Sequence, residues 1–121
     1  MLKIQPTTKT PAVEFNSNAG ELRISGKSIA ENPADFFEPV LEKIKQYKQK
    51  PGYQTNIHIA LEYFNTGSSR SLLEILQTLE PLKSTSEVTI HWYYEKQDDD
   101  MLEIGNDFSE IVKLQFKMIE V

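Results

Sequence analysis

Three hydroxyl residues and a glycine separate an apolar run from a helical pattern in residues 62–70, which read EYFNTGSSR. A stretch of this composition can cap a helix, cradle a phosphate, supply a nucleophile or accept a phosphoryl group. Each of these four chemistries needs further residues at defined spacings, and those residues decide among them.

Neither a phosphate-binding loop nor a serine nucleophile finds its partners in the sequence. A Walker loop needs spaced glycines and a lysine leading into a helix, whereas NTGSSR has one glycine and no lysine. The GKS at residues 26–28 lacks the upstream glycine of that motif. The only histidines, His58 and His91, lie inside expected strands and show no triad pattern, so a serine would have no general base. We therefore expect no catalytic residue.

An acidic run, Asp98, Asp99 and Asp100 followed by Glu103, could supply oxygen ligands to Mg²⁺. It lacks the spacing and central glycine of an EF-hand loop, and consecutive side chains point in different directions. The stronger interpretation is a solvated acidic cap on a helix that starts near Asp99, where negative charge is favourable. A magnesium-dependent enzyme using these aspartates is the lesser alternative, and we expect no metal or cofactor.

Helix capping and phosphorylation remain open for Thr66, Ser68 and Ser69. One hydroxyl should cap the following helix, which contributes about 1 kcal/mol. The two roles are compatible, because free N–H groups and the helix dipole can also receive a phosphate. A phosphate would add roughly −1.5 to −2 charge beside residues 98–100 and change how this surface meets a partner.

Composition predicts one folded domain over residues 1–121, since 39% of the residues are hydrophobic and 10% are aromatic. The net charge of −5 gives no basic footprint for nucleic acid. Cysteine is absent, which excludes disulfides, thiolate metal sites and cysteine catalysis. No apolar run is long enough to span a membrane, and we expect a cytoplasmic protein.

Apolar residues that recur at every second position predict the strands. The expected strands cover residues 2–4, 12–16, 20–25, 56–64, 88–94 and 112–118. The turn residues SNAG join the second and third strands into a hairpin. In the strand at 56–64, the residues expected on one face are Ile57, Ile59, Leu61 and Tyr63, with Ala60 and Phe64 on the other. Apolar character on both faces is typical of a central strand.

Apolar residues at three- and four-residue spacing predict two main helices. The first begins at Asn32 and Pro33, a suitable N-cap and first-turn pair, and ends before KPG at residues 50–52. The second covers about residues 69–83, and a short acidic helical segment covers about 99–106.

Strand–helix–strand units of this kind pair in parallel through right-handed crossovers. We therefore expect an α/β (α+β) fold, a mixed sheet of about five to six strands with two main helices packed on it. The loops at residues 26–32, 65–69 and 95–101 should meet at the C-terminal edge of the parallel strands. Ligands and partners usually bind at such an edge.

Four long motifs cover nearly the whole chain in order: TPAVEF, GELRISGKSIAENPADFFEPV, LEYFNTGSSRSLLEIL and VTIHWYYEKQDDDMLEIGNDF. Together they resemble the SiaC-type regulatory phosphoproteins, a family of bacterial signalling domains. The resemblance implies a switch protein without catalytic activity and with a fold similar to the STAS domains of anti-sigma-factor antagonists.

The resemblance also implies a site and partners. Family members are phosphorylated on the threonine of the YFNT motif, which is Thr66 here, by a SiaB-type kinase and dephosphorylated by a SiaA-type phosphatase. The unphosphorylated form binds and activates a diguanylate cyclase, which raises cyclic di-GMP and affects biofilm formation or aggregation. Our second candidate phosphoacceptor is Ser68. The alternative is a binding module that resembles the anti-sigma-factor antagonists and has another partner.

We expect the surface that binds partners to draw on all three loops at the strand-end edge. Asn65 would shape the turn or contact the kinase, and Arg70 would pair with the phosphate or lie in solvent. The residues expected at this surface are Lys27, Asn65, Gly67, Ser68, Ser69, Arg70, Asp98, Asp99 and Asp100.

Overall fold

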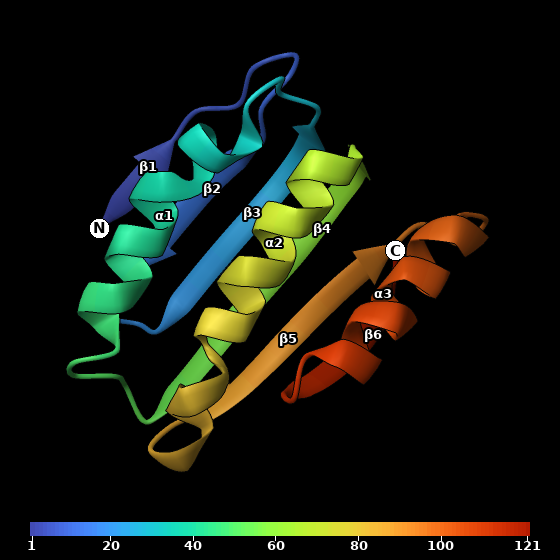
Figure 1. The fold of residues 1–121 in the computed structure, drawn as a ribbon. Coiled ribbons are helices and arrows are strands. Elements are labelled where there is room, and N and C mark those ends of the chain that lie inside the picture. Colours follow the sequence, from blue (N-terminus) through green and yellow to red (C-terminus); the bar gives the residue numbers. More distant parts are fainter.

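Six strands form one mixed sheet whose order follows the chain, and three helices lie against it (Figure 1). This architecture comes from a computed structural model that describes residues 1–121. The strands are β1 (Leu2–Ile4), β2 (Ala12–Asn16), β3 (Glu21–Ser28), β4 (Gln54–Phe64), β5 (Glu87–Tyr94) and β6 (Gln115–Glu120). The helices are α1 (Pro33–Tyr47), α2 (Thr66–Thr78) and α3 (Asp99–Ile111), with a 3-10 helix η1 (Glu80–Ser84) after α2.

The sheet has an antiparallel half and a parallel half. β1, β2 and β3 pair antiparallel, whereas β3, β4, β5 and β6 pair parallel, each joined to the next by a helix. Right-handed crossovers that advance in one direction place their helices on the same side. All three helices accordingly cover one face of the sheet, and the other face has no helix on it (Figure 1). The expected mixed sheet, its hairpin and its parallel strands are confirmed.

The core lies between the sheet and the helices as one cluster of 22 buried hydrophobic residues. Alternate strand residues such as Ile59 of β4 and Trp92 of β5 point into it, as do Val40 of α1, Ile75 of α2 and Phe108 of α3. The period-two and helical patterns of the sequence thus meet in a single layer of apolar side chains.

The helices differ from expectation in length. α2 ends at Thr78 instead of Lys83, because Pro81 has no N–H to continue the helical ladder and the chain tightens into η1. α3 extends over 13 residues, Asp99–Ile111, instead of the short segment expected at about 99–106, so the fold has three main helices rather than two. Val112 was expected in the last strand but is the buried C-cap of α3, and β6 begins only at Gln115.

A bulge near the end of β4 overturns the expected orientation of Tyr63. Gly26 of β3 pairs with Leu61, but the next residue of β3 pairs with Tyr63, which leaves Glu62 without a partner. An extra residue in one strand shifts the alternation of its side chains. Phe64 therefore packs edge-on against Trp92, with ring centroids 6.2 Å apart, whereas Tyr63 is 58% exposed. The predictions that Tyr63 shares the face of Ile57, Ile59 and Leu61 and that Phe64 lies on the other face are therefore wrong.

A glycine allows α3 to pack directly on the sheet, which gives a testable prediction. A Cβ at Gly105 would lie 2.6 Å from the Trp92 ring, whose Nε1–H donates to the Met101 carbonyl at 3.0 Å and cannot swing away freely. We expect Gly105→Ala to lower the free energy of unfolding by about 1–3 kcal/mol through overpacking. This loss would occur despite the gain in helix propensity of about 1 kcal/mol.

Urea denaturation of the full chain measures this change. The matched control is Asn106→Ala, an exposed neighbour in the same helix, which should leave stability unchanged or slightly higher. A Gly105→Ala variant as stable as the control would contradict the close approach of α3 to Trp92.

Candidate functional site

Asn65 lies between the end of β4 and the start of α2, and its hydrogen bonds join this point both to α2 and to the end of β3. Its side-chain Oδ1 accepts from the Ser68 N–H at 2.8 Å, and its Nδ2 donates to the Ala30 carbonyl at 3.1 Å. Its backbone N–H donates to the Ser28 carbonyl at 3.0 Å. Asn65 therefore caps α2 and also ties the helix to the segment that ends β3.

The prediction that a hydroxyl caps α2 is wrong, because the cap is the Asn65 amide. An amide carries both an acceptor and a donor, so it can cap the helix and reach Ala30 at the same time. The Ser68 side chain is instead 1% exposed, and its Oγ accepts a hydrogen bond from the Ser28 Oγ at 2.8 Å. Burial keeps the Ser68 hydroxyl away from a modifying enzyme.

Thr66 occupies the first position of α2 and is exposed. The N–H groups of Thr66 and Gly67 belong to the first turn and have no acceptor within the helix. Gly67 lies against α1, since a Cβ there would come within 3.1 Å of the Pro33 ring. Arg70 is exposed and follows Thr66 by four residues, so both side chains lie on one face of the helix.

The acidic run forms a helix cap, as expected. The Asp98 Oδ1 accepts from the Met101 N–H at 3.0 Å, and Asp99 and Asp100 lie exposed in the first turn of α3. Carboxylates at this end are stabilised by the helix dipole. No group of three or more His, Asp or Glu side chains converges closely enough to hold a metal ion, so the geometry does not favour the magnesium alternative.

The expected surface residues divide into two groups in the structure. Asn65, Gly67 and Ser68 cluster where α1 and α2 begin. Lys27 and Asp98 instead line a cavity of about 380 Å³ together with Tyr63.

A second cavity of about 430 Å³ is lined by Tyr63, Asp98 and Asp100. Ser69, Arg70 and Asp99 line neither cavity. Sequence reasoning missed Tyr63, since a strand alternation read from the chain alone gives no sign of the bulge.

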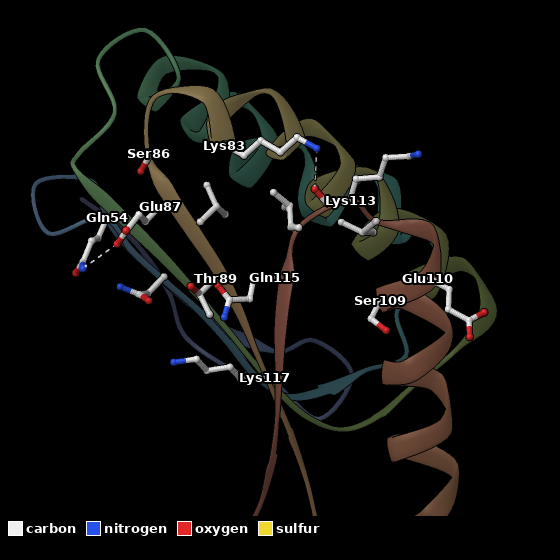
Figure 2. Close-up of a pocket in the computed structure, with 14 residues that line it drawn as sticks. Gln54, Lys83, Ser86, Glu87, Thr89, Ser109, Glu110, Lys113, Gln115 and Lys117 are labelled. Carbon is white, nitrogen blue, oxygen red and sulfur yellow. Dashed lines mark hydrogen bonds between the residues drawn. The ribbon is translucent and has the colours of Figure 1, made fainter.

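The most voluminous cavity, about 790 Å³, lies at the opposite edge, where β5 and β6 begin and α3 ends (Figure 2). Its lining mixes charges of both signs, for example Lys113 and Lys117 with Glu87 and Glu110. The Lys83 Nζ donates to the Lys113 carbonyl at 3.2 Å across it. None of the expected site residues lines this cavity.

The two histidines stack on the sheet face that carries no helix, with ring centroids 4.5 Å apart. The ring nitrogens of His58 lie 2.8 Å from the Tyr93 hydroxyl and 3.2 Å from the Glu21 carboxylate. The His91 Nε2 lies 3.0 Å from Asn56 Oδ1. Both rings are therefore engaged by neighbours on the sheet.

The surroundings of His91 favour its neutral form. Burial, followed by the nearby charges of His58 and Lys117, lowers the pKa of His91, while Glu21 opposes the shift. Lys117 lies directly opposite His91 in the β5–β6 register.

These observations define a class of protein, a two-layer α+β domain whose strand-end edge presents the beginnings of its helices and an exposed threonine at the first position of one of them. None of the helices combines the length and apolar character needed to cross a membrane.

Comparison with known proteins identifies the family. The model for the SiaC family of regulatory phosphoproteins matches residues 4–121, and the chain belongs to this family. An uncharacterized protein of Pseudomonas aeruginosa strain UCBPP-PA14 is 27% identical over 116 residues, which are 95% of this chain and 92% of that protein. The resemblance read from the motifs is therefore confirmed.

Solved structures agree with this assignment. A chain in the crystal structure of the diguanylate cyclase SiaD in complex with its activator SiaC, from P. aeruginosa, superposes with a TM-score of 0.92 at 25% identity, covering 100% of both chains. A structure of SiaC from P. aeruginosa gives a TM-score of 0.88 at 26% identity, covering 99% of this chain and 98% of that one. The crystal structure of apo-SiaC from the same organism gives a TM-score of 0.87 at 26% identity, covering 98% of this chain and 97% of that one. The expected fold class is confirmed.

The cap of α2 predicts a graded response to substitution at Asn65. Asn65→Ala removes both side-chain hydrogen bonds and should lower the free energy of unfolding by about 1–2 kcal/mol. Asn65→Asp keeps the acceptor for the Ser68 N–H and should cost less. Asn32→Ala is the comparison. It removes a longer capping bond, 3.5 Å from the Asp35 N–H to the Asn32 Oδ1, and should therefore cost less than Asn65→Ala. Urea denaturation ranks the three variants, and an Asn65→Ala variant as stable as wild type would refute the capping role.

The lowered pKa of His91 predicts a pH dependence of stability. Below about pH 6.5 His91 binds a proton more readily in the unfolded chain than in the folded chain. The contribution of neutral His91 to the free energy of unfolding is therefore complete above that pH and is lost as the pH falls through the pKa of the folded state. We expect His91→Gln to flatten the decline in unfolding free energy between about pH 7 and pH 5. Urea denaturation across this range measures the slope, and parallel profiles for the two proteins would contradict the account.

Proposed function

We propose that this chain, as one regulatory domain of residues 1–121, is a non-catalytic phosphoswitch of a bacterial partner-switching system. Its unphosphorylated form binds and activates a diguanylate cyclase in the cytoplasm. A SiaB-type kinase phosphorylates Thr66, and a SiaA-type phosphatase restores the free hydroxyl. The observation that carries the proposal is the exposed Thr66 at the start of α2, in a fold that matches a chain of the SiaD–SiaC complex with a TM-score of 0.92.

The geometry around Thr66 suits a phosphate. Thr66 is exposed, and the N–H groups of Thr66 and Gly67 have no acceptor within the helix, so they can receive an anion, which the helix dipole also favours. Arg70, one turn further along the same face, can pair with the phosphate. Phosphorylation would therefore stabilise the existing start of α2 and change the surface charge, with little need to refold the turn.

Other hydroxyls of the stretch fit this role less well. Ser68 is buried and bonded to Ser28, so a kinase could reach it only after local unfolding. A catalytic role for Thr66 itself would need a base, and both histidines are engaged by neighbours on the opposite face of the sheet. Modification thus suits Thr66 better than catalysis does.

The phosphorylation site can be tested by intact-mass measurement after incubation with ATP and a SiaB-type kinase from the same organism. Wild type should gain one phosphate, and Thr66→Ala should gain none. Ser69→Ala is the matched control in the same turn and should be labelled as wild type is. A phosphate that persists on Thr66→Ala would show that another residue is the acceptor.

A further inference from the structure

β4 and β5 separate before they reach the strand-end edge, which opens a groove beside the proposed switch. Their pairing ends at Ile59 and Trp92, although β4 continues to Phe64. The two cavities of about 380 and 430 Å³ lie at this separation. Four residues line both cavities and define what we call the Tyr63 groove: Glu62, Tyr63, Asp98 and Met101.

Tyr63 makes the groove unusual among the surfaces of this protein. The bulge at Glu62 turns the ring out of the core, so that a tyrosine of a central strand is 58% exposed. Such a ring offers a large, rigid contact area at low cost in side-chain entropy, and tyrosine is enriched at the centres of interfaces. The other tyrosine of comparable exposure, Tyr53 at 81%, lies just before the opposite end of β4 and lines neither cavity.

The charge around Tyr63 indicates what would bind there. The only lysine or arginine that lines either cavity is Lys27, in the cavity of about 380 Å³. The carboxylates that line them are Glu62, Glu95, Asp98, Asp100, Glu103 and Asp107. The two lysine–carboxylate pairs of the protein involve Glu14 and Glu42, and Glu21 lies beside His58, so none of these contacts neutralises this set. A cationic partner would therefore be attracted, and an anionic one repelled.

We propose that the Tyr63 groove binds a basic segment of the partner, with an arginine guanidinium stacked on the Tyr63 ring and paired with the surrounding carboxylates. Arginine suits this site better than lysine, because its planar group both stacks on aromatic faces and bonds carboxylates bidentately. The identification of that partner as a diguanylate cyclase rests on the proposed function, whereas the chemistry of the groove does not.

The chemistry can be tested without the cyclase. The full-length, ¹⁵N-labelled chain is titrated with a hexa-arginine peptide, and with a hexaglutamate peptide as the charge control, while amide resonances are followed. Arginine should perturb residues 62–64 and 98–103 most, and glutamate should not.

Single substitutions then separate the ring from the charge. We expect Tyr63→Ala and Glu103→Lys each to weaken arginine-peptide binding about threefold or more. Tyr63→Phe should bind as wild type does, because the ring and not the hydroxyl makes the contact. The matched controls, Tyr53→Ala at the other end of β4 and Glu110→Lys near the end of α3, should leave binding unchanged. Perturbations spread evenly over all acidic residues, or an equal loss in Tyr53→Ala, would overturn the proposal.

Binding of the same variants to the diguanylate cyclase separates this inference from the proposed function. We expect Tyr63→Ala to weaken cyclase binding about tenfold, with Tyr53→Ala unaffected. If wild type and Tyr63→Ala bind the cyclase equally, the groove is not the docking site, while the proposed function stands. If wild type does not bind the cyclase but the arginine peptide still maps to the groove, the partner assignment fails and the groove chemistry stands.

Discussion

The hydrogen bonds of Asn65 hold the start of α2 in place, and the presentation of Thr66 depends on them. Asn65 is bonded both to the helix that it caps and to the segment after β3. The preceding residue, Phe64, is anchored against the rings of Trp92 and Phe108, with the Phe108 centroid 6.5 Å away. Thr66 thus follows two residues that the fold fixes from different sides. A phosphate added there would act on a surface whose backbone is already in position, and the signal would lie in charge and shape rather than in refolding.

Local sequence patterns predicted the helices and strands of this fold, because periodicity and capping depend on residues only a few positions apart. Alternating apolar residues located the strands, and short polar residues before the helices located the caps at Asn32 and Asp98. The sequence did not reveal Tyr63, because the bulge that turns it outward is set by its pairing with Lys27 on another strand. The Asn65 cap was missed for a similar reason. Its advantage over a hydroxyl lies in a second partner 35 residues away in the chain, which no local pattern shows.

The charge of the strand-end edge constrains how the proposed switch can work. A phosphate on Thr66 would make an acidic edge more acidic and would increase its long-range attraction for a basic partner. Release of such a partner on phosphorylation would therefore have to come from short-range exclusion where α2 begins, or from Arg70 pairing with the phosphate instead of contacting the partner. On this account phosphorylation shortens the lifetime of the complex more than it slows encounter.

The most direct measurement is the rate of cyclic di-GMP synthesis by the diguanylate cyclase as this chain is titrated in, before and after treatment with the kinase. The account predicts that untreated wild type activates the cyclase and that kinase-treated wild type does not. Thr66→Ala should activate equally before and after treatment. Activation that survives stoichiometric phosphorylation, or a Thr66→Ala variant that still loses activation on kinase treatment, would contradict the assignment of Thr66 as the switch.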